Sequence, residues 1–227
     1  MSILLHEQLL LIALDDEKGT IGRPYVDIAL AGAVLVDLLR GGRIATVDSE
    51  VRAVPHAATV GGVLDDAAAV IAGEPRVHDL RWWVKGLPGR LKPFVPRLAA
   101  RLVQDGVLAA EQHKVLGLFP STRLPERDHA SEAEVDERLR QTLLGESPPD
   151  EDSAVLAGLV GAANLVGSVV EDRTRRKEAE RRAEELGRGL GVGTAVEEAI
   201  AAARAEVMAA VIASTVSSAT SATIVAP

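Results

Sequence analysis

The sequence contains no cysteine and few aromatic residues. Without cysteine there are no disulfides, thiolate metal ligands or thiol nucleophiles, so cysteine-based zinc and iron–sulfur sites are excluded. Aromatic residues make up only 2% of the 227 residues, so the core must be aliphatic. RNA-binding modules that stack bases on aromatic side chains are therefore disfavoured. Hydrophobic residues make up 47%, which is enough for a sizeable core and excludes wholesale disorder.

Recognisable catalytic and cofactor-binding motifs are also missing. The chain has no phosphate-binding GxxxxGK[ST] loop and no GxSxG nucleophile motif. The glycines of residues 187–193 follow a charged helical stretch and not a strand, so they indicate a helix end and not a dinucleotide site. The histidines lack metal-ligand spacing and are expected to be surface or locally satisfied residues. We therefore expect no enzyme, no catalytic residue, no cofactor and no metal at His6, His56, His78, His113 or His129.

Long uncharged stretches are few. Residues 154–170 are uncharged but short for a membrane span, and they contain glycine, asparagine and serine, which favours a helix buried in the core. Residues 207–227 become rich in Ser, Thr and Ala, as expected of a fraying helix end and tail. The leucine-rich start has no basic region before it and does not resemble a signal peptide. We expect a cytoplasmic protein, at most attached to a membrane surface.

The hydrophobic pattern predicts a mainly α fold, a single compact helical domain with small β-hairpins. One hairpin is expected around residues 48–50 and another over residues 107–119. Capping boxes at Ser131/Glu134 and Thr194/Glu197 mark two helix starts, the second opening a helix that reaches about residue 214. The predicted domain covers residues 1–214, followed by a flexible tail over residues 215–227. Helices are expected at residues 3–14, 25–39, 63–72, 97–104, 132–144 and 153–170.

One segment departs from the acidic character of the chain, whose formal net charge is −8. Residues 76–101 contain seven basic residues and one acid, a local charge of +6, and three of the five aromatic residues. Trp82 and Trp83 beside cations are typical of the membrane–water interface, where each basic residue contributes about 1 kcal/mol on an anionic leaflet. The prolines near residue 94 favour a helix start there, whose amino terminus, flanked by Arg90 and Lys92, would attract a phosphate. Alternatively, the tryptophans are core residues and the cations pair with acidic helices.

Two further segments allow two interpretations each. The apolar residues 115–120 either pack inside the protein or form a hydrophobic tip that enters a bilayer or another subunit. Residues 171–188 mix acidic and basic residues that can pair one helical turn apart, so they indicate a solvated helix face or a surface for a partner.

Four passages of the sequence resemble the Golgi phosphoprotein 3 family, in a bacterial version. They are EQLLLIALDDEKG at residues 7–19, LAGAVLVDLLRGGRI at residues 30–44, LVQDGVLAAE with the following LGLF within residues 97–119, and EVMAAVIA at residues 206–213. Their order and spacing carry the resemblance, which extends from residue 5 to about residue 214. The composition, rich in Ala, Val and Arg, is typical of a GC-rich bacterial genome.

The resemblance implies a compact helical domain that binds phosphatidylinositol 4-phosphate at membranes without catalysis. In eukaryotes it implies an adaptor that retains glycosyltransferases by their cytosolic tails. The lipid-pocket positions of the family fall at Gly22, Ala31, Lys92 and Val95, of which only Lys92 is charged. The residues expected to bind a headgroup are Arg23, Tyr25, Arg90, Lys92 and Arg97.

The resemblance also implies that residues 111–122 form a hairpin that inserts into membranes and self-associates. Its tip would consist of Val115, Leu116, Leu118 and Phe119.

The resulting hypothesis is a non-catalytic peripheral membrane protein that binds anionic phospholipid. A basic loop over residues 85–97 would hold headgroup phosphates while the hairpin tip enters the interface. Possible further partners are a protein client and a second copy bound through the hairpin. The alternative is a protein-interaction adaptor or scaffold without lipid specificity. Nucleic acid is not an expected partner, because the net charge of −8 opposes it.

Overall fold

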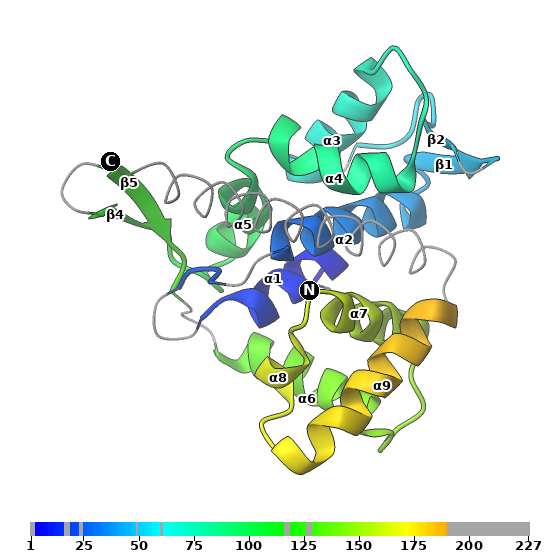
Figure 1. Ribbon diagram of the computed structural model, residues 1–227. Helices are drawn as coiled ribbons and strands as arrows, with labels where there is room; N and C mark the ends of the chain where they lie inside the picture. Colours follow the sequence, from blue (N-terminus) through cyan, green and yellow to red (C-terminus); the bar gives the residue numbers. More distant parts are fainter. Residues whose placement is uncertain are drawn as a thin grey trace, which may run out of the picture.

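The computed structural model describes residues 3–15, 19–22, 25–48, 50–59, 61–115, 119–125 and 129–189. These residues form a helical body with two small antiparallel sheets (Figure 1), which confirms the predicted mainly α fold with small hairpins. The expected last helix to residue 214 and the tail over residues 215–227 lie outside the described residues. The helices are α1 (Leu5–Ala13), α2 (Val26–Arg40), α3 (Gly62–Gly73), α4 (Leu80–Arg90), α5 (Phe94–Gln104), α6 (His129–Leu144), α7 (Glu151–Ala162), α8 (Val166–Val169) and α9 (Arg173–Gly189). The strands are β1 (Ile44–Val47), β2 (Glu50–Ala53), β3 (His78–Asp79), β4 (Glu111–Val115) and β5 (Phe119–Arg123).

Helix α2 is the centre of the body. Its sequence is apolar on nearly every side, which is the pattern of a helix surrounded by other elements. Figure 1 shows it between an upper group that contains α3, α4 and the first sheet and a lower group that contains α6 to α9. Leu30, Leu35 and Leu38 are fully buried, and α1, α4 and α7 pack against α2. Apart from Trp83 and Phe94 the core is aliphatic, as the shortage of aromatic residues predicts.

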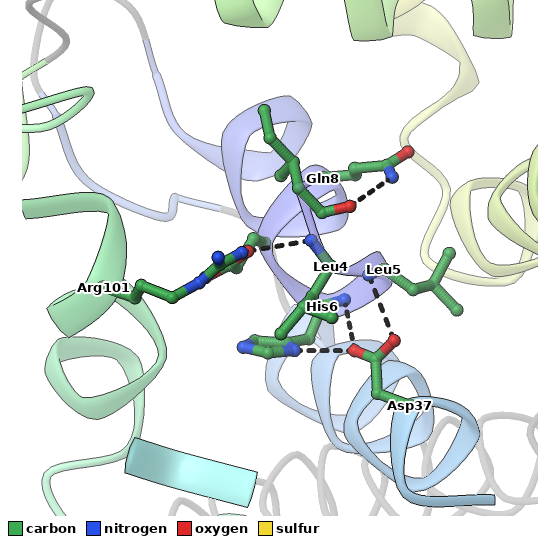
Figure 2. A network of polar contacts seen from close by, with 8 residues as sticks. Leu4, Leu5, His6, Gln8, Asp37 and Arg101 are labelled. Carbon is green, nitrogen blue, oxygen red and sulfur yellow. Dashed lines mark hydrogen bonds and ion pairs between the residues drawn. The ribbon is translucent and has the colours of Figure 1, made fainter. Parts of the chain in front are cut away.

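Polar contacts with α2 and α5 hold the amino terminus of α1 (Figure 2). Leu4 has no side chain that could cap the helix, and Asp37 of α2 supplies the missing acceptor. The Asp37 carboxylate accepts hydrogen bonds from the backbone N–H groups of Leu5 (3.2 Å) and His6 (3.0 Å) and lies 2.6 Å from His6 Nδ1. The Glu7 carboxylate accepts the Leu4 N–H at 2.8 Å and pairs with Arg101 of α5. The position of α1 is thus fixed by charges from two neighbouring helices.

The first sheet leads directly into α4. Its order is β1-β2-β3, with Val51 of β2 opposite His78 of β3. The Asp79 carboxylate then accepts the Trp82 N–H at 2.8 Å, which makes Asp79 the N-cap of α4. The sheet therefore determines where α4 begins and which way its first turn faces.

The expected basic loop over residues 85–97 is largely helical, which corrects that expectation. Helix α4 continues to Arg90 although it contains Pro88, and α5 begins at Phe94, as the prolines predicted. Proline removes one backbone donor from the helix. Because Trp83, Val84 and Leu87 bury one face of α4, packing stabilises the helix through this position. Only three residues connect α4 and α5.

The second hairpin is displaced from its predicted strands. The strands β4 and β5 pair antiparallel, with Val115 opposite Phe119, and Figure 1 shows the hairpin projecting from the helical body. The predicted first strand at residues 107–108 instead closes α5: after Gly106, with φ +77°, the N–H groups of Val107 and Leu108 donate to the Leu102 carbonyl. On leaving the hairpin, the Leu124 N–H donates to the Gly19 carbonyl at 2.8 Å.

The predicted helix over residues 153–170 is interrupted. Asn164 adopts φ +59° between α7 and α8, a conformation that asparagine tolerates better than most residues. Helix α9 packs closely on α7: a Cβ on Gly158 would lie 2.8 Å from Gly187 Cα, and Ala179 and Ala183 are buried. Among the described residues no helix combines the length and the apolar character that a membrane crossing requires.

Candidate functional site

Four side chains, from the C-cap of α3, from β3 and from α4, form a cluster that we name the Trp82 stack: Glu74, His78, Trp82 and Arg90. The His78 ring lies parallel to the Trp82 ring, with centroids 3.5 Å apart and an angle of 5° between the planes. The Arg90 guanidinium lies over the Trp82 ring at 4.2 Å from its centroid, a cation–π distance. Glu74 Oε1 lies 3.7 Å from His78 Nε2 and Glu74 Oε2 lies 3.6 Å from Arg90 Nη2. A guanidinium and an imidazole thus lie against one indole and near one carboxylate.

The Trp82 stack depends on helical spacing and on one glycine. Trp82, Gly86 and Arg90 follow one another at intervals of four residues and so share one side of α4. A Cβ on Gly86 would lie 2.4 Å from Arg90 Nη1, so the absence of a side chain lets the guanidinium fold back over the indole. There Arg90 Nη1 also donates to the Gly86 carbonyl at 3.2 Å.

The two tryptophans differ in exposure. Trp83 is only 1% exposed and belongs to the core, whereas Trp82 is partly exposed. Consecutive residues of a helix point about 100° apart, so a helix packed on one face buries one and leaves the other at the surface. Of the two expected interfacial aromatics, only Trp82 has that exposure.

The basic residues of residues 76–101 are partly neutralised by carboxylates from elsewhere in the chain. Arg97 pairs with Asp66 of α3 at 2.8 Å, and Arg101 pairs with Glu7 of α1. The hydrogen bond to Glu7 raises the pKa of Arg101 above its ordinary value, against the opposing effect of burial. The local charge of +6 therefore overstates the charge of this face, because α1 and α3 contribute acids that lie outside the segment.

Three exposed cations of the same segment have no such partner. The side chains of Arg76, Arg81 and Lys92 form no hydrogen bond or ion pair with any residue that the structure describes. Arg81 lies next to Trp82 on α4, and Lys92 lies two residues beyond Arg90 in the connection to α5. The Trp82 stack is thus flanked at both ends of α4 by available positive charge.

The lipid-pocket and headgroup positions that the family resemblance suggests lie in several elements and not in one cluster. Ala31 is fully buried within α2, and Val95 is half-buried in the first turn of α5. Lys92 is exposed, and Tyr25 is the partly buried N-cap of α2 with φ +68°. Arg23 lies outside the described residues. Among the headgroup candidates that the structure describes, Arg90 lies over the Trp82 ring, whereas Arg97 pairs with Asp66 of α3.

Only part of the expected hairpin tip can be placed. Val115 ends β4 and Phe119 begins β5, where they pair across the hairpin. Leu116 and Leu118 lie outside the described residues.

Two members of the Trp82 stack and its glycine were not among the predicted site residues. His78 is four residues before Trp82 in the sequence, but it lies on β3, so helical spacing gives no reason to pair them. Glu74 lies 16 residues before Arg90, just after α3, and only the fold brings them together. Gly86 could have been found from its spacing of four residues to both Trp82 and Arg90.

A cavity of about 650 Å³ lies elsewhere, between the start of α1, α5, α6 and α7. Apart from Asp105, its charged side chains already have partners: Arg101 pairs with Glu7, Arg138 with Glu134 at 2.7 Å, and Asp152 with Arg40 at 2.7 Å. An anionic ligand would therefore have to break one of the pairs of Arg101 or Arg138 to bind there. In the described residues no group of His, Asp and Glu side chains is arranged to hold a metal ion.

Comparison with known protein families gives a match over most of the chain. The chain matches the Golgi phosphoprotein 3 (GPP34) family over residues 5–203, from α1 through every described helix. No curated protein matches the chain. Because the match covers most of the sequence, and the helical body with its hairpins agrees with the resemblance found in the sequence, the chain belongs to the Golgi phosphoprotein 3 (GPP34) family.

Proposed function

We propose that this protein is a non-catalytic peripheral membrane protein that binds anionic phospholipid, of the phosphatidylinositol 4-phosphate type. Family membership supports the lipid class, because the family resemblance implies a phosphoinositide-binding domain. The face that carries α4 and the start of α5 would meet the headgroups, and the hairpin β4–β5 would enter the interface. The protein would act at the cytoplasmic surface of a membrane.

The observation that carries the proposal is the partly exposed Trp82 with the Arg90 guanidinium 4.2 Å from its ring centroid. Indole groups favour the headgroup depth of a bilayer, and a guanidinium binds phosphate oxygens in bidentate geometry. Because Trp82 and Gly86 hold Arg90 in one place, less side-chain entropy would be lost on binding. The exposed Arg81 and Lys92 would add attraction to an anionic leaflet.

A second anchor would come from the hairpin. One weak membrane signal gives only reversible attachment, and stable binding generally requires two. The proposed tip residues Val115, Leu116, Leu118 and Phe119 would supply apolar area, and the α4 face would supply charge. Helix α5, 11 residues long, connects these two regions and spans about 16 Å.

Vesicle flotation tests this function. Vesicles of phosphatidylcholine alone, or with phosphatidylglycerol, phosphatidylinositol or phosphatidylinositol 4-phosphate, would be compared with the wild-type protein. We expect binding to the anionic vesicles, strongest with the 4-phosphate, and at least a tenfold loss in Arg81→Glu/Lys92→Glu. Arg181→Glu/Arg188→Glu on α9 changes the net charge equally and should lose less than twofold. Equal absence of the wild-type protein from all four vesicle types would refute lipid binding.

A variant of the hairpin tip separates this function from that of an adaptor without lipid specificity. An adaptor would capture one dominant protein partner, and Leu116→Asp/Phe119→Asp would leave that capture unchanged. If the hairpin self-associates, this double variant should instead lower the molecular mass measured in solution by static light scattering.

A further inference from the structure

Glu74 has two ion-pair contacts in the Trp82 stack, and both are longer than a hydrogen bond. Its carboxylate lies 3.7 Å from His78 Nε2 and 3.6 Å from Arg90 Nη2. Hydrogen bonds between nitrogen and oxygen are normally 2.7–3.2 Å long, so the carboxylate lies near both groups without a hydrogen bond to either. The Glu74 side chain is also 20% exposed, which gives it a route into solvent.

The positions of His78 and Arg90 do not depend on Glu74. His78 is held by its stacking on Trp82 and by the pairing of β3 with Val51 of β2. Arg90 is held by the Trp82 ring and by the Gly86 carbonyl. If the Glu74 carboxylate moved away, the imidazole and the guanidinium would remain facing the space that it had occupied.

We infer that Glu74 occupies the place of an anionic ligand, and that a phosphate monoester displaces it to bind between His78 and Arg90. This inference rests on the proposed function and adds two residues to it: Glu74 as an internal competitor and His78 as a second phosphate-binding group. A phosphate dianion carries more charge and more acceptor oxygens than the carboxylate that it replaces. It can therefore form short hydrogen bonds to both groups where Glu74 forms none.

Binding to phosphatidylcholine vesicles that contain phosphatidylinositol 4-phosphate, measured at pH 7.5, tests this exchange. Glu74→Gln should bind roughly threefold to fivefold more tightly than the wild-type protein, the effect of one charge at a partly exposed site. Glu50→Gln removes an equal charge from the neighbouring strand and should change binding less than twofold. His78→Phe keeps a ring on Trp82 but has no ring nitrogen to bind a phosphate, so it should bind these vesicles more weakly than the wild-type protein.

The outcomes separate the inference from the proposed function. If the wild-type protein binds the vesicles but Glu74→Gln binds no more tightly than Glu50→Gln, the inference is overturned and the lipid function stands. If neither the wild-type protein nor Glu74→Gln binds vesicles or inorganic phosphate, both are overturned. If Glu74→Gln binds inorganic phosphate, as followed by the NMR signals of His78, but no vesicles, the exchange is supported with a soluble phosphate ligand and the lipid function fails.

Discussion

At the scale of single residues, Glu7 shows how strongly a buried charge depends on its partners. Its side chain is almost completely buried, and its carboxylate contacts the Arg101 guanidinium and the Leu4 N–H. A buried carboxylate is costly unless it is paired and hydrogen-bonded. Glu7 therefore joins α1 to α5 and at the same time accepts a backbone donor at the start of α1.

We expect Glu7→Gln to lower the free energy of unfolding by about 2–4 kcal/mol, because the change removes the carboxylate charge that pairs with the partly buried guanidinium of Arg101. Urea denaturation followed by circular dichroism measures the loss. Glu134→Gln is the matched control, since it removes the carboxylate of an exposed pair with Arg138 and should cost less than about 0.5 kcal/mol. Equal losses in the two variants would mean that the Glu7 pair contributes no more than a surface pair.

Single residues of the candidate site could be predicted only where their relation is local. Trp82 and Arg90 stand out in the sequence as an aromatic and a cation within one basic segment, and they meet on α4. The partners of the other arginines come from distant segments: Asp66 for Arg97 and Glu7 for Arg101. A linear segment gives its own charge but not the acids that the fold places beside it.

At the scale of elements, the contact between α7 and α9 depends on residues without side chains. A Cβ on Gly158 would lie 2.8 Å from Gly187 Cα, so the two backbones approach more closely than an alanine allows. The obstacle is backbone and cannot rotate away, so Gly158→Ala should destabilise the protein by about 1–3 kcal/mol through displacement of α9. Thermal unfolding measures this effect.

Gly89→Ala is the corresponding control on α4. A Cβ there meets no atom within 4 Å, so the change should stabilise the protein by about 0.4–1 kcal/mol through the entropy of the unfolded chain. If Gly158→Ala were equally stabilising, α9 would have to move from α7 without cost, which the close approach argues against.

The N-cap of α7 gives the fold a dependence on pH. The Asp150 carboxylate accepts the Ser153 N–H at 2.7 Å, and this hydrogen bond lowers the pKa of Asp150 below its ordinary value of 3.8. A carboxyl group whose pKa is lowered by folding stabilises the fold above its ordinary pKa, and this contribution is lost as the pH falls through the lowered value. Asp150→Ala should therefore cost about 0.5–1 kcal/mol near pH 7 and progressively less below about pH 4.

Denaturation of the wild-type protein and of Asp150→Ala between pH 7 and pH 3 measures the difference in their free energies of unfolding. Asp150→Asn keeps an acceptor that does not titrate, so it should remain more stable than Asp150→Ala at every pH. A difference between wild type and Asp150→Ala that stays constant with pH would contradict the assignment of the cap.

Helices were the elements that the sequence predicted best, because their apolar faces repeat within one segment. The exceptions have local causes that the hydrophobic pattern does not contain. Residues 107–108 look like a strand but donate to the Leu102 carbonyl to close α5, and Asn164 interrupts an apolar run with a positive φ. Residues 85–90, expected in a basic loop, are helical although they include Pro88, because the burial of Trp83 and Leu87 stabilises α4. Competition between local pattern and packing therefore decides these boundaries.

At the scale of the whole molecule, the distribution of charge should make lipid binding depend on salt in an unusual way. Residues 76–101 carry +6, whereas the rest of the chain carries −14. Residues 132–152, over α6 and α7, carry eight acidic and two basic residues, and Figure 1 shows these helices in the lower group, away from α3 and α4, so part of the remaining negative charge is distant from the proposed binding face. The screening length decides whether an anionic membrane interacts with the charge of the basic face alone or with the net charge of the whole protein.

Binding to phosphatidylglycerol vesicles should accordingly be strongest at intermediate salt. At about 0.01 M salt the screening length is roughly 30 Å, so the net charge of −8 repels an anionic surface; at about 0.1 M it is roughly 10 Å and only the basic face is felt. At about 1 M it is roughly 3 Å, and the attraction itself is screened. Glu184→Gln/Glu185→Gln on α9 should shift the maximum of binding to lower salt, because they remove repulsion that acts only at long range. A steady decline of wild-type binding from the lowest salt upward would mean that the distant acids do not influence the approach to the membrane.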